Sequence, residues 1–556
     1  MGSGSIGAKA RGLATARRFL THEIAPRFEP AIRAGVPLLA VVATDVFDHL
    51  MQEEGLREIA VSPPPDEQIV QAFRAAPLPP TLIADLLSFL AQVDSPLAVR
   101  SSSLLEDAMF EPFAGVYATR MVPNRAARLD GRLGQLTAAI ADVYASVYCR
   151  RARTYREGTR QPDRVEKMAI VIQEAMGTRR DDRFYPHVSG VARSVNFYPT
   201  GLARPEDGIV ELALGFGRSI VHEGVCWSYS PACPQANPPY GTPRDLLEQT
   251  QKEFWALDMA PGSAPARTDA ADWLKKYRLS DAEHDGMLEL VASTYLADDD
   301  RIVMGVTRSG PRVIDFAPIL KADAVPLNAL IRALLNGCEQ AFRTGVEIEF
   351  ALTLPGEGAA AARFGLLQVR PMVASYPVVE VDLAALGRGR LLASSSRALG
   401  NGRVASIRDV VYVEPEAFDR ARSRSIGADL DAINRRLVAQ DCPYILVGFG
   451  RWGSSDPSAG VPISFAQISG ARVIVEVPFS DTGFMPSQGS HFFHCITSSR
   501  ILYFSVERDG PDSVDWAWLA SQTPVAETPF VRHVRCEKPL LVEVDGRTGR
   551  GVILKE

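Results

Sequence analysis

The chain contains 556 residues, of which 46% are hydrophobic and 23% are charged. This length predicts about three to five domains, and the composition excludes intrinsic disorder, collagen-like repeats and disulfide-rich miniproteins. The chain has 60 Lys and Arg against 66 Asp and Glu, so we expect no nucleic-acid partner, and any anion-binding site must be local.

The cysteines and the apolar stretches indicate where the protein resides. Seven cysteines are scattered without a C-x-x-C pair, which predicts reduced thiols and a cytoplasmic location. The apolar stretches 37–44 and 82–93 are shorter than the roughly 18 residues of a membrane-spanning helix. The Gly/Ser-rich start, followed by basic residues, lacks the apolar segment of a secretory signal. We therefore expect no membrane association. The sequence leaves open whether residues precede Met1.

Helix and strand patterns alternate along the chain, which predicts an α/β (α+β) protein. The periodicity predicts helices over 10–20, 81–93, 129–155, 281–297 and 327–344. It predicts strands over 35–44, 96–100, 165–173, 208–214, 346–352, 364–372, 410–413, 444–447, 472–477 and 501–504. A stretch rich in Gly, Arg and Ser over 387–402 is typical of an interdomain connection. We expect a first domain over 1–374 with subdomains of about 1–195 and 196–374, a linker over 375–402, and a smaller α/β C-terminal domain over 403–556.

Two neighbouring strand segments carry the most informative polar pattern. Because side chains alternate across a strand, Glu347 and Glu349 share one face, and Gln368 and Arg370 share one face of the next segment. A hairpin of the two strands would bring all four groups together. The oxygens of Glu349 and Gln368 suit Mg²⁺, while Arg370 offers a planar fork for phosphate. An exposed strand face is the alternative for the two glutamates.

Two cationic segments are compatible with the same site. A Gly-rich loop over 2–12 precedes a helix and carries Lys9, so its backbone N–H groups and the ammonium are candidates for phosphate contacts. Arg100 ends a predicted strand and is followed by three serines. The alternatives are a solvated cation at a helix end for Lys9 and a surface ion pair for Arg100.

Together these segments resemble the ATP-grasp nucleotide-binding domain of the phosphoenolpyruvate synthase and pyruvate, phosphate dikinase family. The resemblance extends from Gly2 to about Met372. Its landmarks, in chain order, are the Gly-rich loop with Lys9, Gly35-Val36-Pro37, Val42-Ala43-Thr44, Val99-Arg100-Ser101-Ser102, Glu106-Asp107, Phe113-Ala114-Gly115, Ser189-Gly190-Val191-Ala192 and Leu367-Gln368-Val369-Arg370-Pro371.

The resemblance implies a two-subdomain ATP-grasp fold that binds ATP and Mg²⁺. It implies that Lys9 and Arg100 hold phosphates and that Glu347 lies on the ribose side. Glu349 and Gln368 would bind the metal, and Arg370 would assist phosphoryl transfer. The strand 168–173, ending at Gln173, would supply the edge that faces adenine.

The sequence departs from this family in two ways. Gly215-Phe216-Gly217-Arg218 stands where the family usually has Gly-Leu-Gly-Glu, so a cation replaces an acid near the phosphates. After Met372 the chain is too short for both the family's swivelling phosphohistidine domain and its phosphoenolpyruvate-binding barrel, which has about 250 residues. A complete phosphoenolpyruvate-forming cycle is therefore not expected in this chain.

The C-terminal domain carries two further candidate sites. Gly448-Phe449-Gly450-Arg451-Trp452-Gly453 has the spacing of a dinucleotide-binding loop, but the prolines that follow disfavour the required helix. An anion site that uses Arg451 and Ser454 is a second interpretation, and a structural turn in which Trp452 packs is a third.

His491 follows Gly489-Ser490, in a context loosely similar to the phosphoacceptor of the family's swivelling domain. Its imidazole is chemically competent to accept a phosphoryl group. The alternative is a half-buried histidine stacked on its two neighbouring phenylalanines. We expect no zinc site, because the eight histidines form no H-E-x-x-H motif or close pair.

These observations predict an ATP- and Mg²⁺-dependent phosphotransferase or kinase. The acceptor would be His491, a small molecule or a partner protein. The alternative is a non-catalytic ATP-binding regulatory module that signals nucleotide state to a partner protein. ATP-grasp ligation shares the fold, but no carboxylate acceptor can be identified.

Overall fold

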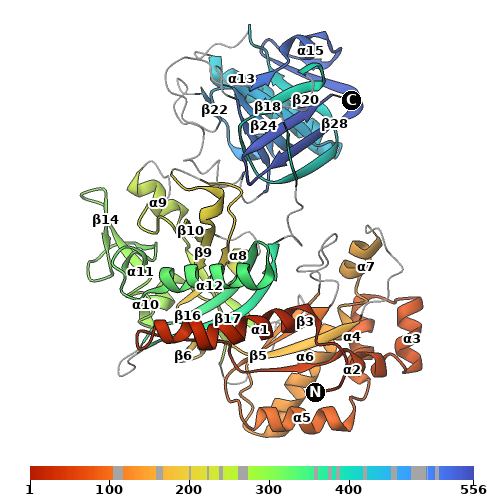
Figure 1. Ribbon diagram of the computed structural model, residues 1–556, viewed down its shortest axis with the longest axis vertical. Helices are drawn as coiled ribbons and strands as arrows, with labels where there is room; N and C mark the ends of the chain where they lie inside the picture. Colours follow the sequence, from red (N-terminus) through yellow and green to blue (C-terminus); the bar gives the residue numbers. More distant parts are fainter. Residues whose placement is uncertain are drawn as a thin grey trace. The chain divides into compact units, whose positions relative to one another are not determined.

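The computed structural model describes residues 1–103, 117–157, 167–199, 202–221, 225–236, 242–260, 273–355, 361–372, 379–382, 388–416, 422–452, 460–477, 496, 499–506 and 512–555. The chain forms two compact units. The N-terminal unit comprises Met1–Ser194, Val210–Gln235 and Thr250–Ser375, and the C-terminal unit comprises Val195–Ile209, Ala236–Gln249 and Tyr376–Glu556. Each unit combines helices and sheets (Figure 1), which confirms the α/β prediction.

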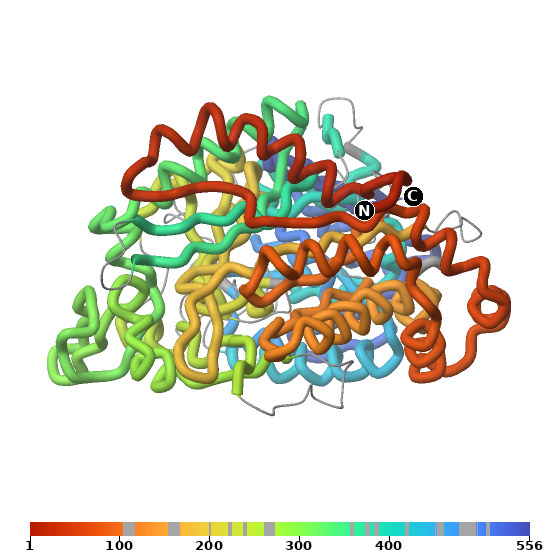
Figure 2. Tube along the Cα trace, turned by 90° about the horizontal axis from the view of Figure 1, so that it is seen from below, coloured from red at the N-terminus to blue at the C-terminus, as the bar shows by residue number. Residues whose placement is uncertain are grey.

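The largest sheet of the N-terminal unit has six strands. Their order is β1 (Ile32–Gly35), β17 (Ala362–Pro371), β16 (Val346–Thr353), β8 (Val188–Arg193), β9 (Ile209–Ala213) and β10 (Trp227–Tyr229). Helices α1 (Gly7–Phe19) and α12 (Leu327–Phe342) pack on this sheet, against β17 and β16 respectively. Figure 2 shows the red helix α1 beside the green strands β16 and β17. A Cβ on Gly12 would lie 2.4 Å from the Val369 carbonyl oxygen, so glycine permits this close approach.

A second sheet has the order β2 (Leu39–Val42), β5 (Met168–Glu174), β3 (Leu97–Ser103) and β4 (Thr119–Val122). Val99, Ile170 and Ile172 face an apolar core formed with α2 (Thr44–Leu50), α3 (Glu54–Val61), α4 (Asp66–Ala75), α5 (Pro80–Leu90), α6 (Leu129–Ala145) and α7 (Arg150–Glu157). Because strand residues alternate, Arg100 and Gln173 lie on the opposite face of this sheet.

Two smaller sheets complete the N-terminal unit. One has the order β12 (Leu274–Arg278), β11 (Glu253–Asp258), β7 (Arg183–Tyr185) and β6 (Thr178–Arg180), and the other β14 (Arg301–Met304), β13 (Ala292–Leu296) and β15 (Arg312–Ile314). The short helices are α8 (Arg218–Val221), α10 (Leu279–His284) and α11 (Ala317–Leu320), and α9 (Pro243–Gln249) belongs to the C-terminal unit.

The C-terminal unit is built on one sheet of ten strands. Nine follow the order β19 (Arg397–Leu399), β25 (Leu502–Ser505), β24 (Ala471–Val477), β21 (Tyr444–Phe449), β20 (Gly402–Val413), β28 (Val531–Asp545), β29 (Arg550–Leu554), β18 (Leu391–Ser395) and β26 (Ser513–Val514), and β27 (Pro524–Glu527) pairs with β28. Strands β18 and β19 lie near opposite ends of this strand order, although only Ser396 separates them in the chain. The sheet therefore curls back on itself around an apolar core. Helix α13 (Ser423–Ala439) packs on a second core at the other face.

The structure corrects several predicted elements. The stretch 35–44 is not one strand, because Pro37 and the residues beside it separate β1 from β2. The predicted helix 129–155 ends at Ala145, where the Ser146 hydroxyl donates to the Val143 carbonyl, and resumes as α7. The predicted helix 281–297 ends before Gly286, whose φ is +69°, and its second half is the strand β13.

The predicted linker 375–402 also contains regular structure. Strands β18 and β19 lie within it, and Leu392 and Ala393 are buried in the core of the C-terminal unit. The Ser-rich composition suggested an exposed linker, but Ser394 and Ser395 are buried. Ser395 Oγ donates to the Ser505 carbonyl at 2.6 Å, so its polar group has a partner inside the unit.

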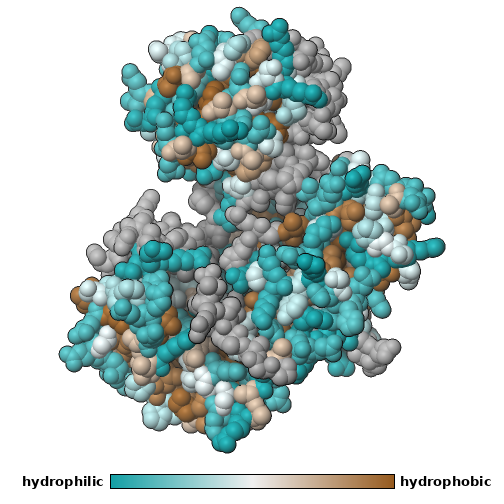
Figure 3. Space-filling model, turned by 180° about the vertical axis from the view of Figure 1, so that it is seen from behind, coloured by the Kyte–Doolittle hydropathy of each residue, from teal (hydrophilic) through white to brown (hydrophobic). Residues whose placement is uncertain are grey.

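Figure 3 shows a mainly hydrophilic described surface, with apolar residues in scattered patches on the face drawn. Within the described ranges, no helix has both the length and the apolar composition needed to cross a bilayer.

A buried histidine makes the stability of the N-terminal unit dependent on pH. Burial lowers the pKa of His187 to about 4, and its Nδ1 accepts the Leu354 N–H at 3.2 Å. Because the unfolded chain takes up this proton at higher pH than the folded chain, stability is lost as pH falls below about 6.5. We expect a loss of about 2 kcal/mol between about pH 7 and pH 5.

Urea unfolding of wild type and His187→Asn at several pH values measures this effect. The asparagine removes the titrating ring but keeps a hydrogen-bond acceptor. The variant should show a flatter pH profile over this range, and parallel profiles would contradict the assignment.

Candidate functional site

Strands β16 and β17 form the antiparallel hairpin that the sequence predicts. Glu347 lies opposite Arg370 and Glu349 lies opposite Gln368, so the four polar side chains share one face. The register shifts between Glu349 and Phe350, which leaves Leu367 as an extra residue in β17. Such a bulge changes the direction of the backbone locally, and bulges are common beside active sites.

Arg100 joins the second sheet to this hairpin. Its Nη2 donates to Glu349 Oε2 at 2.6 Å and to Gln368 Oε1 at 2.9 Å, and its Nη1 donates to the Leu367 carbonyl at 3.3 Å. The side chains of Arg100 and Glu349 are 16% and 25% exposed, so solvent reaches the pair. The carboxylate and the amide oxygen therefore both lie within hydrogen-bond distance of one cationic nitrogen atom.

Lys9, in the first turn of α1, contacts the residue that follows Arg100 on β3. Its Nζ donates to the carbonyl oxygen of Ser101 at 2.9 Å and to its hydroxyl at 3.3 Å. The hydroxyl of Ser102 donates to the Ile6 carbonyl at 3.0 Å and fixes the start of α1 against β3. Gly7 has a φ of +74°, and a Cβ there would lie 1.7 Å from the Ser102 carbonyl oxygen. Only glycine fits at this position.

The Gly-rich loop does not present all of its N–H groups to a ligand. The Asp45 carboxylate accepts the backbone N–H groups of Ser3 at 2.9 Å and Gly4 at 3.1 Å, and the Thr44 hydroxyl accepts that of Ser5 at 3.0 Å. The Ser3 hydrogen bond is the main cause of a lowered Asp45 pKa. These three N–H groups therefore have partners in the same chain, and phosphate contacts of the loop and of Lys9 stay a prediction.

Glu347 is held between two guanidinium groups. Its Oε1 accepts from Arg370 Nε at 2.7 Å, and its Oε2 accepts from Arg193 Nε at 2.6 Å. Burial by itself would raise the pKa of Glu347, but the two arginines outweigh this effect and lower it. A second carboxylate, Glu211, accepts from Arg193 Nη1 at 2.6 Å. The Glu347 side chain is only 6% exposed, whereas those of its partners Arg193 and Arg370 are 21% and 18% exposed, so the carboxylate is buried beneath two partly exposed guanidinium groups.

Sequence reasoning missed Arg193 and Glu211. Alternation along β8 would have placed Arg193 on a common face with Val191, but only the structure shows that β8 pairs with β16, with Arg193 opposite Glu347. These two partners are separated by 154 residues in the chain, and local periodicity carries no information about such a pairing.

Gln173 lies in β5 with Leu39 and Ala98 as its neighbours on the two adjacent strands. Its side chain is 1% exposed, yet its Nε2 has no hydrogen-bond partner in the described part of the chain. A buried amide donor without a partner is typical of a site that a ligand or water completes. The prediction that Gln173 belongs to a ligand site is thus compatible with its surroundings.

Arg218, in the departing Gly215–Arg218 segment, lies over an aromatic ring. Its Cζ is 4.4 Å from the centroid of the Trp255 ring, and the Trp255 carbonyl accepts the Phe216 N–H at 2.9 Å. The cation at this position therefore has an aromatic partner in the fold.

The remaining predicted residues belong to the C-terminal unit. His491, Ser454 and the side chain of Arg451 lie outside the described residues. The backbone of Arg451 and Trp452 forms the short strand β22 (Arg451–Trp452), paired with β23 (Gly460–Val461). Trp452 is 1% exposed in the core beside α13, as a structural turn requires.

Comparison with known protein families gives a match to one family model over the first two thirds of the chain. Residues 3–377 match the family model described as the pyruvate phosphate dikinase AMP/ATP-binding domain. The chain belongs to this family. The match covers the resemblance inferred from Gly2 to about Met372, and it includes the hairpin β16–β17, Arg100 and Lys9. A search of curated proteins gave no match.

The family assignment establishes an AMP/ATP-binding domain, and the site residues fit a magnesium nucleotide. Glu349 and Gln368 supply hard oxygen atoms that already converge on a cation, the Arg100 guanidinium. Mg²⁺ prefers such oxygens and completes its coordination with phosphates and water. In the described ranges no three His, Cys, Asp or Glu side chains form a metal cluster, so any Mg²⁺ held there would need oxygens from the nucleotide.

Proposed function

We propose that this chain is an ATP- and Mg²⁺-dependent phosphotransferase whose N-terminal unit binds the nucleotide. The observation that carries the proposal is the convergence of Glu349 and Gln368 on Arg100 inside a domain of the pyruvate phosphate dikinase family. Lys9 and Arg100 would bind phosphates, and Glu347 and Gln173 would contact the ribose and adenine sides. Magnesium, when bound by Glu349 and Gln368, supplies charge neutralisation for the phosphates.

The chain's residues would act by position and charge. Arg370 extends from β17 beside Gln368, so its planar fork can stabilise charge on the transferred phosphoryl group. An acceptor nitrogen or oxygen attacks phosphorus while a P–O bond of ATP breaks, and the electron pair of that bond leaves with the nucleotide. We propose His491, a bound small molecule or a partner protein as the acceptor.

Product analysis with ATP labelled separately at the β and γ phosphorus atoms tests this proposal. AMP and free phosphate, with β label retained on the protein, would support attack of a histidine on the β phosphorus with AMP as leaving group, followed by attack of water on the γ phosphorus that releases phosphate. His491→Ala would then abolish the retained label. ADP with γ label on an added acceptor would support direct kinase chemistry. ADP and free phosphate, with no label on any acceptor, would show that the chain only hydrolyses ATP, and this result would contradict the proposal.

A non-catalytic ATP sensor is the second candidate. Two observations favour it: Arg218 stands where the family usually has an acid, and Arg370 is already bound to a buried carboxylate. In a sensor, nucleotide binding would change the affinity for a partner without turnover. Tight Mg-ATP binding by calorimetry together with no labelled product would support the sensor and reject the phosphotransferase.

A further inference from the structure

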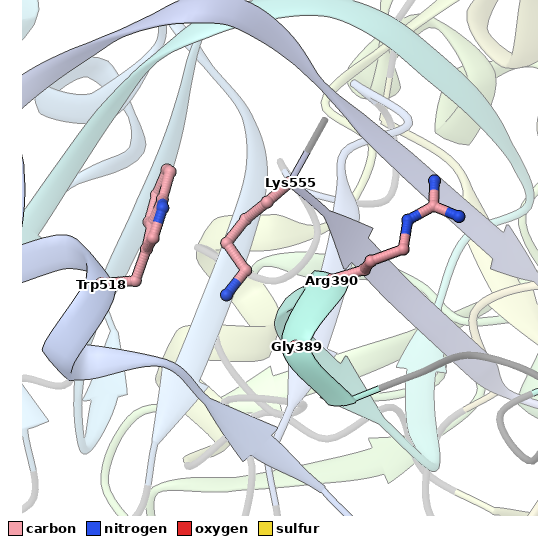
Figure 4. Close-up of a pocket in the computed structure, with 4 residues that line it drawn as sticks. All are labelled: Gly389, Arg390, Trp518 and Lys555. Atoms are coloured by element: carbon pink, nitrogen blue, oxygen red, sulfur yellow. The ribbon is translucent and has the colours of Figure 1, made fainter.

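An open cavity of about 520 Å³ lies in the C-terminal unit. It is lined by Gly389, Arg390, Trp518 and Lys555. Figure 4 shows Lys555 between the Trp518 indole and the turn at Gly389 and Arg390. This volume lies within the range of about 300–1,000 Å³ that is usual for small-molecule sites.

Three separate parts of the chain hold these side chains in place. The Arg390 carbonyl accepts the Lys555 N–H at 2.8 Å, which ties the start of β18 to the end of β29. Trp518 belongs to α15 (Trp516–Ser521), and the Asp515 carboxylate accepts the Trp518 N–H at 2.9 Å. The Leu392 carbonyl accepts the Asp515 N–H at 2.8 Å, so backbone hydrogen bonds join all three segments.

Asp515 also fixes the lysine. Lys555 Nζ donates to Asp515 Oδ2 at 2.6 Å and lies 5.7 Å from the centroid of the Trp518 ring. The Lys555 side chain is only 12% exposed, so the ammonium is held at the cavity rather than extended into solvent. The Lys555 hydrogen bond is the main cause of a lowered Asp515 pKa, so the carboxylate stays charged and the pair stays intact at neutral pH.

Three charged side chains of the described residues lie at the cavity: the cations Arg390 and Lys555, and the anion Asp515, which pairs with Lys555. Arg390 is exposed, and its guanidinium has no hydrogen-bond or ion-pair partner in the described residues. Figure 4 shows this guanidinium directed away from the indole, and its exposure leaves it free to turn inward without breaking an ion pair.

We propose that this cavity binds a small phosphomonoester of a planar ring. The ring would stack on the Trp518 face, and the phosphate oxygens would accept from Arg390 and Lys555. A planar fork and an ammonium together suit a dianion with three terminal oxygens better than a single carboxylate. This site is distinct from the proposed nucleotide site, because none of the residues that line it belongs to the N-terminal unit.

NMR of the full chain labelled with ¹⁵N-Trp tests the proposal, because it observes the indole N–H of Trp518 directly. Trp518→Phe identifies the Trp518 signal, and phenyl phosphate serves as the probe. We expect saturable movement of the Trp518 signal, with inorganic phosphate, benzyl alcohol and benzoate each binding at least about tenfold more weakly. Equal affinity for phosphate alone, for the alcohol or for benzoate, or no movement at millimolar phenyl phosphate, would overturn the proposal.

Arg390→Ala supplies the second measurement. The variant should fold normally because Arg390 is exposed, and it should weaken phenyl phosphate binding by about tenfold or more. Arg550→Ala is the matched control, since it removes an exposed arginine from the other end of β29. If Arg390→Ala binds phenyl phosphate as tightly as wild type, the guanidinium does not contact the ligand, and the assignment is contradicted. Loss of ATP binding in the N-terminal unit would not move the Trp518 signal, so the two proposals fail separately.

Discussion

Replacing Arg370 with lysine is expected to lower the rate of phosphoryl transfer by about 100-fold, with Mg-ATP affinity changed by less than about threefold. Lysine preserves the charge beside Glu347, so the buried network keeps a cationic partner at that oxygen. It removes the planar fork that can contact two oxygens of the transferred phosphoryl group. The loss should therefore appear in kcat, because the interaction strengthens in the transition state.

Single-turnover kinetics and calorimetry with Mg-ATP separate these two quantities. Arg312→Lys is the control, because it makes the same chemical change in β15, where the guanidinium contacts Glu283. This control should retain both turnover and affinity. A loss of affinity in Arg370→Lys equal to its loss of turnover would show that Arg370 holds the ground-state nucleotide instead.

Replacing Glu347 with glutamine is expected to destabilise the N-terminal unit by about 3 kcal/mol. The substitution keeps the size of the side chain but removes the charge between Arg193 and Arg370. The two guanidiniums are about one fifth exposed, at 21% and 18%, so water compensates only part of the loss. Urea unfolding of wild type and variant at neutral pH measures the difference.

Glu211→Gln is the matched control for this stability effect. Glu211 contacts the same Arg193, but its side chain is 22% exposed compared with 6% for Glu347. We expect a cost below about 1 kcal/mol for Glu211→Gln. Equal costs for the two variants would show that burial of Glu347 does not determine the energetics of the network.

We expect the difference in unfolding free energy between wild type and Glu347→Gln to become smaller at acidic pH. The pKa of Glu347 in the folded chain lies below its ordinary value of 4.5. The charge therefore contributes its stability above about pH 4.5, and this contribution is lost as pH falls through the lower folded pKa. The two unfolding curves should converge in acid, and a difference that persists there would contradict the assignment.

The polar pattern of the candidate site was readable from the sequence. Alternation placed Glu347 with Glu349 and Gln368 with Arg370, and the hairpin register confirms that the two pairs face each other. The helix after the Gly-rich loop and the strand that carries Arg100 were also predicted, because each has a strong local period. These features depend only on neighbouring residues.

The contacts between distant segments required the structure. Arg100 reaches Glu349 across 249 residues, and Arg193 reaches Glu347 across 154. The same limit explains why the sequence did not show that Asp45 accepts two N–H groups of the Gly-rich loop. A local sequence pattern does not show which distant carboxylate will accept a hydrogen bond from a given N–H group in the folded chain.

The sequence by itself determined the α/β class, the membership of the first two thirds of the chain in an AMP/ATP-binding family, and the strand faces that Glu347 shares with Glu349 and Gln368 with Arg370. Only the tertiary structure decided how those side chains pair, and that Leu391–Leu399 joins two parts of a curled sheet instead of forming a linker. The physical reason is that period and composition record which residues prefer burial, whereas ion pairing and strand order depend on which segments meet in space.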